Sequence, residues 1–175
     1  ANITYTNSLG CSVGTTMTIN ATPTITGANA VCVGSTTQLT GTATAATTNP
    51  WVSSNTSVAT VSNSGVVTGV AAGTANITYT NSLGCSSVKT ITVNALPTVA
   101  VSSVTICSGG SATLTATPSQ AGGTYSWSNS ATTASITINP TTTASYIVTY
   151  SLSGCTGTGA GTVTVNPAPT VSVNS

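Results

Sequence analysis

Apolar and polar residues alternate along many short stretches of the chain, and turn residues separate these stretches. A period of two residues is typical of strands with one face in a core and the other in solvent. Turns are indicated by Asn63-Ser64-Gly65, Ala121-Gly122-Gly123 and Asn139-Pro140. We find no helical period longer than one turn, so the sequence predicts an all-β protein. The alternating segments are Thr36–Thr44, Val58–Val61, Thr74–Thr80, Lys89–Val93, Thr113–Thr117, Ser135–Ile138, Tyr146–Tyr150 and Thr162–Val165.

One segment of the chain is repeated letter for letter. The sequence ANITYTNSLGC occupies Ala1–Cys11 and recurs at Ala75–Cys85. Other landmarks keep nearly the same spacing, and self-similarity at a fixed period indicates an array of like units. These landmarks are Cys32 and Cys107, Leu39 and Leu114, Trp51 and Trp127, Cys85 and Cys155, and Pro23, Pro97 and Pro169.

The prolines set the expected boundaries of the units, because proline has no N–H to donate and suits strand starts and connectors. We expect one unit over residues 22–95 and a second over residues 96–168. Residues 1–21 are then expected to be the last hairpin of a preceding unit, and residues 169–175 the first strand of a following one. With about seven short strands, each unit is predicted to be a β-sandwich.

Each predicted unit has one tryptophan, about 20 residues after its first cysteine. A sandwich places its central core tryptophan at this position. We therefore expect Trp51 and Trp127 in the cores, together with the matching leucines Leu39 and Leu114. The alternative for the two indole rings is stacking against sugars.

The five cysteines follow the repeat. Each full unit has one cysteine near its start and one in its late hairpin, so the predicted disulfides are Cys32–Cys85 and Cys107–Cys155. Cys11 corresponds to Cys85, and its partner is expected outside the chain. Each bridge closes a loop of about 50 residues, worth roughly 4 kcal/mol by chain entropy. Disulfides also indicate an oxidising compartment.

Proton-exchanging and charged side chains are almost absent. The 175 residues include one Lys, Lys89, and no Arg, Asp, Glu or His. General acid–base catalysis usually needs a His or a carboxylate, calcium and magnesium need carboxylate oxygens, and nucleic acids need a basic patch. The sequence therefore predicts no enzyme, cofactor, metal site or nucleic-acid interface. No apolar run approaches the length of a membrane span.

Residues 51–77, WVSSNTSVATVSNSGVVTGVAAGTANI, resemble the signature of bacterial immunoglobulin-like (Ig-like) group 2 domains. The second unit carries ICSGGSATLTA from Ile106, YSWS from Tyr125 and SGC from Ser153. It resembles the Ig-like repeats of giant surface proteins of Bacteroidota, which include gliding adhesins and filaments exported by the type IX pathway. The matching positions of residues 51–77 are Trp51, Ser53, Ser54, Val58, Ala59, Val61, Gly65, Val67, Thr68, Gly69, Gly73, Ala75 and Ile77.

The resemblance implies tandem Ig-like sandwiches on the cell surface, acting as a stalk, adhesin or filament without shared catalytic residues. The implied partners are adjacent Ig-like domains of the same polypeptide and, in a fibre, lateral or homo-oligomeric neighbours. The alternative is a module that binds a glycan or another cell surface through loops at one end of each sandwich. Exposed tyrosines, for example Tyr125 or Tyr150, would then take part.

Overall fold

The computed structural model describes residues 1–171, which form strands and connecting loops with no helix among them. The chain divides into two compact units, Ala1–Val93 and a second that begins at Asn94. Each unit has its own hydrophobic core. The fold is therefore all-β, and each core belongs to a separate sandwich.

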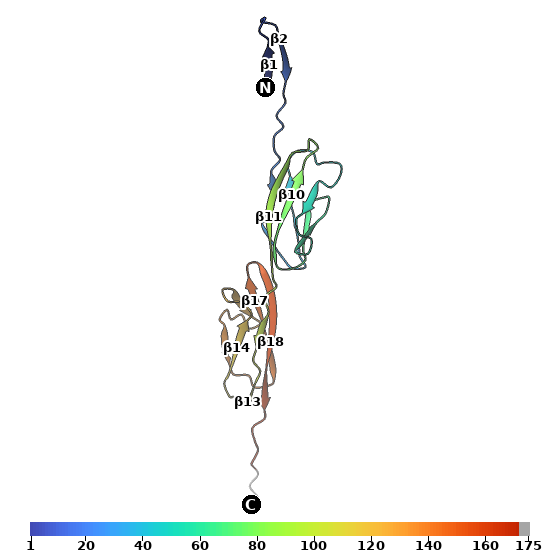
Figure 1. Cartoon of the computed structure of the whole chain (residues 1–175). Coiled ribbons are helices and arrows are strands. Elements are labelled where there is room, and N and C mark those ends of the chain that lie inside the picture. Colours follow the sequence, from blue (N-terminus) through green and yellow to red (C-terminus); the bar gives the residue numbers. More distant parts are fainter. Residues whose placement is uncertain (172–175) are drawn as a thin grey trace, which may run out of the picture. The chain divides into compact units, whose positions relative to one another are not determined.

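The first unit contains a hairpin, β1 (Asn2–Thr6) and β2 (Ser12–Thr16), followed by a two-layered sandwich (Figure 1). One layer is a four-stranded sheet in the order β4-β11-β10-β7. The other consists of the sheet β5-β9-β8 and the pair β3-β6. The sandwich strands are β3 (Ile25–Thr26), β4 (Ala30–Cys32), β5 (Thr36–Gln38), β6 (Thr40–Gly41), β7 (Trp51–Ser53), β8 (Ala59–Val61), β9 (Val66–Gly69), β10 (Gly73–Thr80) and β11 (Ser86–Asn94).

Nine short strands therefore stand in the first sandwich where about seven were expected. No alternating segment was expected before Thr36, yet two strands form there on either side of Gly27, and β3 pairs with β6 whereas β4 pairs with β11. Gly27 has φ 120°, a conformation that only glycine adopts readily. The expected strand Thr36–Thr44 is interrupted at Leu39, which separates β5 from β6.

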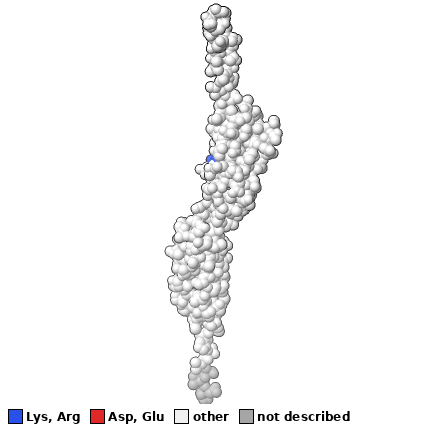
Figure 2. Space-filling view, viewed as in Figure 1, with Lys and Arg blue, Asp and Glu red and all other residues white. Residues whose placement is uncertain are grey.

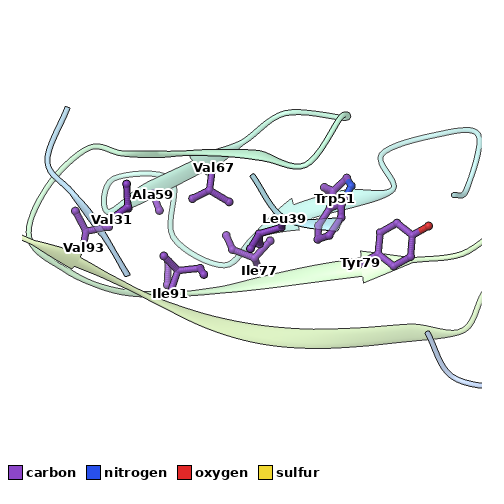
Figure 3. Close-up of a cluster of buried hydrophobic side chains, with 10 residues drawn as sticks. Val31, Leu39, Trp51, Ala59, Val67, Ile77, Tyr79, Ile91 and Val93 are labelled. Carbon is purple, nitrogen blue, oxygen red and sulfur yellow. The ribbon is translucent and has the colours of Figure 1, made fainter. Parts of the chain in front are cut away.

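The core of the first sandwich lies between its two layers. Figure 3 shows Leu39, Ile77 and Ile91 pointing into this space. Along β10 every second residue is buried, which is the pattern expected of a strand with one face in a core. Each fully buried leucine, isoleucine or valine contributes about 1.5–3 kcal/mol relative to its exposed state. The buried residues are Val31, Leu39, Trp51, Ala59, Val67, Ala75, Ile77, Tyr79, Ile91 and Val93.

The second unit is a seven-stranded sandwich within its described part (Figure 1). A three-stranded sheet, β12-β14-β16, faces a four-stranded sheet, β13-β18-β17-β15, in which β13 runs parallel to β18. Of the segment predicted to start a following unit, residues 169–171 are not in a strand and 172–175 lie outside the described residues. The strands are β12 (Val99–Val101), β13 (Val104–Cys107), β14 (Ala112–Pro118), β15 (Thr124–Trp127), β16 (Ser135–Ile138), β17 (Ala144–Leu152) and β18 (Cys155–Asn166).

Alternate glycines of β18 allow the opposite layer to approach its backbone. A Cβ atom built on Gly157 would overlap the carbonyl oxygen of Pro97, and one built on Gly159 would overlap that of Val99. A Cβ atom on Gly161 would lie 2.7 Å from the oxygen of Ser102. Residues 156–162, TGTGAGT, therefore form a strand whose glycine face lies directly against the main chain of residues 97–102.

The four residues expected in the cores are all buried, with exposed fractions of 1% for Leu39, 6% for Trp51, 0% for Leu114 and 3% for Trp127. The Trp51 ring lies against Tyr79, with ring centroids 4.6 Å apart. The Trp127 indole N–H donates a hydrogen bond to the Thr133 carbonyl at 2.8 Å. Neither ring presents a face to solvent for stacking against a sugar.

Candidate functional site

The hairpin β1–β2 has the same strand register as the hairpin β10–β11 of the first sandwich. Asn2 stands opposite Thr16, and at the matching position Asn76 stands opposite Thr90. The Thr16 hydroxyl donates to the Asn2 side chain at 3.0 Å, and the Thr90 hydroxyl donates to Asn76 at 2.8 Å. The identical residues 2–6 and 76–80 thus pair in the same register with partner strands whose sequences differ.

The turns of the two hairpins are also the same. The Oδ1 atom of Asn7 accepts the N–H groups of Leu9 and Cys11, at 3.0 and 2.9 Å. The Oδ1 atom of Asn81 accepts the N–H groups two and four residues ahead at the same distances. An asparagine that bonds to backbone ahead of it fixes a tight turn. The repeated segment therefore determines the turn of both hairpins.

The two hairpins differ in what covers them. Ile77 and Tyr79 are 0% and 3% exposed because the opposite layer covers them, whereas their counterparts Ile3 and Tyr5 are 48% and 69% exposed. All residues of β1 and β2 are exposed. One face of this hairpin thus presents side chains whose counterparts form a core. We call it the hairpin face, and it consists of Ala1, Ile3, Tyr5 and Met17.

An isolated two-stranded hairpin is marginally stable in water, and it gains stability when its apolar face packs against further strands. The hairpin face is therefore the candidate functional surface of the chain. The repeat in the sequence could reveal the hairpin, but only the structure shows that its apolar face is left uncovered.

The predicted disulfide Cys32–Cys85 is wrong, since Cys85 is a free thiol and Cys32 is disulfide-bonded. Cys32 lies beside Val93. A Cβ atom built on Gly69 would lie 2.7 Å from the carbonyl oxygen of Cys32 and 2.9 Å from Cγ1 of Val93. Cys85 precedes Val93 by eight residues along an extended strand, or about 25 Å. A disulfide requires Cα atoms within about 7 Å.

The predicted disulfide Cys107–Cys155 is wrong for the same reason. Cys107 is a free thiol and stands opposite Asn166, the last residue of β18, whereas Cys155 is its first residue and is disulfide-bonded. The two cysteines lie at opposite ends of a strand that is about 35 Å long. Cys11 is exposed and free. A partner for Cys11 was expected only because its counterpart Cys85 was expected to form a disulfide. Cys85 is free too, so that reason no longer holds.

The surface offers little for electrostatic or metal recognition. Figure 2 shows one blue spot on an otherwise white face, and Lys89 is the only basic side chain in the sequence. Within residues 1–171, His, Cys, Asp and Glu nowhere gather in threes that could hold a metal ion. The same residues contain no helix that is long and apolar enough to cross a membrane.

The tyrosines proposed for the alternative function are largely unavailable. Tyr150 is 0% exposed. Its hydroxyl donates to the Gln120 carbonyl and accepts the Gly123 N–H, both at 2.7 Å. Tyr125 is half-buried, with its ring 5.0 Å from that of Tyr150. Tyr150 is a core residue whose hydroxyl holds a loop, so the expectation that it is exposed is wrong.

Residues 15–93 match the family model of the bacterial Ig-like domain (group 2). No curated protein matches the chain. The sequence match is therefore confined to residues 15–93, and the rest of the chain is matched only by solved structures.

Three solved structures illustrate the likeness. Domains 4 and 5 of the S-layer protein SbsC are 20% identical with a TM-score of 0.39, over 82% of this chain and 98% of that one. The N-terminal four Ig domains of Dscam1 isoform 9.44 are 13% identical with a TM-score of 0.36, over 90% of this chain and 51% of that one. The PKD domain of human KIAA0319 is 16% identical with a TM-score of 0.33, over 46% and 91%.

The chain spans about half the length of the Dscam1 fragment it matches. With all three TM-scores below 0.5, these structures carry no argument about function. No catalytic family is indicated by the comparisons. The chain is thus a tandem of Ig-like β-sandwiches, the first of which matches the bacterial Ig-like domain of group 2.

Proposed function

We propose that the chain is a structural segment of a long extracellular filament or cell-surface adhesin built from tandem Ig-like domains. The observation that carries the proposal is the hairpin face. The β1 strand and its turn repeat β10 and its turn in sequence, and the two hairpins share one register, yet no described residue covers the apolar side chains of β1–β2. It is the closing hairpin of a third Ig-like sandwich, whose other strands come from an adjacent domain of the same polypeptide or from a neighbouring molecule in a fibre.

The chemistry of the chain supports a role that depends on shape. With no Asp, Glu, His or Arg in the sequence, the chain lacks the groups that usually transfer protons or bind hard metal ions. A surface with a formal net charge of +1 also has little of the electrostatic repulsion that keeps soluble proteins apart. Lateral association of such surfaces in a fibre is therefore part of the proposal.

An extracellular location is supported by the disulfide-bonded cysteines Cys32 and Cys155, because disulfides persist mainly in oxidising compartments. Export by the type IX pathway and a host among the Bacteroidota complete the proposal. Both come from the sequence resemblance of the second unit.

A chimaeric chain tests the hairpin directly. Residues 22–74 are placed immediately before Ala1 of the full chain, so that Ala1–Cys11 follows them as Ala75–Cys85 does in the native sequence. We expect the added strands and the β1–β2 hairpin to form a third cooperative unit, with slow hydrogen exchange at the amides of residues 2–16. The matched control is the same chimaera with Ile3→Ser and Tyr5→Ser, which should lose the third unfolding transition. If the unsubstituted chimaera leaves the hairpin amides as fast as in the original chain, the hairpin is not a closing hairpin.

The cellular role is tested by immunogold electron microscopy with antibodies against this chain. Intact cells of the source organism should carry label on surface fibres or on the cell envelope without permeabilisation. Label that appears only after permeabilisation would contradict the extracellular role and would leave the chimaera result untouched.

A further inference from the structure

A cavity of about 310 Å³ opens into the first sandwich beside the buried aromatic pair Trp51 and Tyr79. The segment that contains β5 and β6 lines one side of it, and the turn between β8 and β9 lines another through Asn63 and Ser64. Its volume lies at the lower end of the range of about 300–1,000 Å³ that is usual for small-molecule sites. The cavity is therefore large enough for a small ligand or for the end of a larger one.

The indole N–H of Trp51 is directed to this cavity. Trp51 is 94% buried, and its Nε1–H makes no hydrogen bond within the described protein. Among the buried and half-buried residues of 1–171, no side-chain nitrogen or oxygen that is itself fully buried lacks a hydrogen-bond partner. The Nε1–H must then reach the space that Trp51 lines, and Figure 3 shows the nitrogen on the side of the ring away from Ile77 and Ile91.

The second sandwich shows that this is not a general property of the fold. Trp127 occupies the matching position, and its Nε1–H donates to the Thr133 carbonyl at 2.8 Å. A donor in a largely buried ring costs stability when it lacks an acceptor. The first sandwich thus leaves unpaired a donor that the second sandwich pairs internally.

Two glycines allow close packing around the aromatic pair beside the cavity. Gly65 has φ +84°, and a Cβ atom built there would overlap the carbonyl oxygen of Leu39 and lie 3.1 Å from Cε2 of Trp51, the carbon bonded to Nε1. A Cβ atom on Gly41, which also lines the cavity, would overlap the ring of Tyr79. A side chain at either position would force the Leu39 main chain or the Tyr79 ring out of its place beside the cavity.

The remaining polar groups of the lining are neutral. The Gln38 Nε2 atom donates to the carbonyls of Leu39 and Ser64, at 2.6 and 2.8 Å, which fixes the amide beside the turn. The Gln38 Oε1 atom, the Thr40 hydroxyl and the Asn63 amide make no hydrogen bonds within the described residues. The lining thus offers both donors and acceptors, and it includes no charged side chain.

We propose that this cavity binds the hydroxyl groups of a neutral sugar, such as the terminal residue of a glycan. A hydroxyl both accepts and donates, so it can accept the Trp51 Nε1–H and donate to the Gln38 Oε1 atom. An acidic sugar has no cation to meet in this lining. The sugar is held through the edge of the indole, since the face of the buried ring is covered by the core. This activity goes beyond the structural role proposed above and is independent of it.

The full chain labelled with nitrogen-15 provides the test, because its two indole N–H resonances report on one sandwich each. Trp51→Phe and Trp127→Phe assign the two signals. The probes are glucose, galactose and N-acetylglucosamine, each titrated to tens of millimolar. We expect at least one of them to shift the Trp51 signal saturably while the Trp127 signal stays in place. If none of the three shifts the Trp51 signal, or if both indole signals move together without saturation, the proposal is overturned.

Substitutions separate binding from folding. The sugar is also expected to bond to the Thr40 hydroxyl, a lining group without a partner among the described residues. Thr40→Val removes this hydroxyl and keeps the shape of the side chain, so it should weaken binding about tenfold, the typical value of one hydrogen bond. The matched control Thr60→Val removes an exposed hydroxyl on β8, outside the cavity lining, and should leave binding unchanged. Equal affinity for the Thr40→Val and Thr60→Val chains would contradict the assigned site. Trp51→Phe should abolish binding in a chain whose other amide resonances stay dispersed.

Discussion

Asn81 closes the β10–β11 turn by accepting the backbone N–H of Cys85 at its Oδ1 atom, 2.9 Å away. The same oxygen accepts the N–H of Leu83 at 3.0 Å, and Asn81 is only 2% exposed. Asn81→Ala leaves both donors without this acceptor, so we expect the free energy of unfolding of the first sandwich to fall by about 1–3 kcal/mol. Urea unfolding followed by Trp51 fluorescence, in a Trp127→Phe background, measures the change.

The duplicated segment supplies the control for this prediction. Asn7 makes the same two hydrogen bonds in the β1–β2 turn, but it is exposed and its hairpin has no cover. Asn7→Ala should leave the unfolding of the first sandwich unchanged. An equal loss from Asn7→Ala and Asn81→Ala would mean that the burial of the turn contributes nothing.

Gly159→Ala is expected to destabilise the second sandwich by about 1–3 kcal/mol, the usual cost of overpacking. The added methyl group would overlap the carbonyl oxygen of Val99, and a backbone atom moves aside less readily than a flexible side chain. Trp127 fluorescence during urea unfolding, in a Trp51→Phe background, measures the loss. Ala160→Ser changes the exposed neighbouring residue and should stay within about 0.5 kcal/mol. A neutral Gly159→Ala would show that the β12 backbone does not lie on β18.

Three tyrosines should rank by the hydrogen bonds that their hydroxyls make. Tyr150 makes two in the core of the second sandwich, Tyr79 makes one to the Ala43 carbonyl at 2.9 Å, and the exposed Tyr5 makes none within the described residues. Tyr150→Phe should cost about 1–3 kcal/mol. Tyr79→Phe should cost less, and Tyr5→Phe nothing measurable. Urea unfolding of the three variants gives the ranking, and a neutral Tyr150→Phe would contradict it.

The sequence could predict the strands and the repeated units because both depend on local patterns. Alternation along Thr74–Thr80 places Ala75, Ile77 and Tyr79 on one face, and the structure buries all three. The burial of Trp51 and Trp127 was predictable for a similar reason, because a large ring at the same strand position of each unit is expected in the core. The separation of β3 from β4 at Gly27 depends on which sheet each strand joins, and no local pattern carries that information.

The errors arose where distance along a strand decides the outcome. The repeat shows that Cys85 and Cys155 are equivalent, but it does not show at which end of the sandwich each one lies. The unpaired indole of Trp51 was also beyond reach, because Trp127 has the same place in the sequence pattern and a different hydrogen bond. The burial of Tyr150 could not be predicted either, because its hydroxyl is hydrogen-bonded to Gln120 and Gly123, in a loop distant in sequence.

Thiol mapping checks the corrected cysteine assignment. Alkylation of the folded chain should modify Cys11 and Cys107 rapidly because both are exposed, and the half-buried Cys85 more slowly. Cys32 and Cys155 should be modified only after reduction, since both are disulfide-bonded. Mass spectrometry of the peptides distinguishes the two classes. Recovery of a Cys32–Cys85 or Cys107–Cys155 peptide would contradict the structure and restore the pairing expected from the repeat.

The stability of both sandwiches should be independent of pH across the weakly acidic and neutral range. Stability changes with pH only where the folded and unfolded chains bind different numbers of protons. The sequence has no Asp, Glu or His, so no side chain ordinarily titrates between about pH 4.5 and 7. We expect the two midpoints of thermal unfolding to vary by less than about 1 °C over this window, since the linkage slope is zero. Asn81→Asp is the matched positive control, because a carboxyl group at a 2% exposed position makes the first midpoint depend on pH. A sigmoidal change of either midpoint in the unsubstituted chain would contradict the prediction.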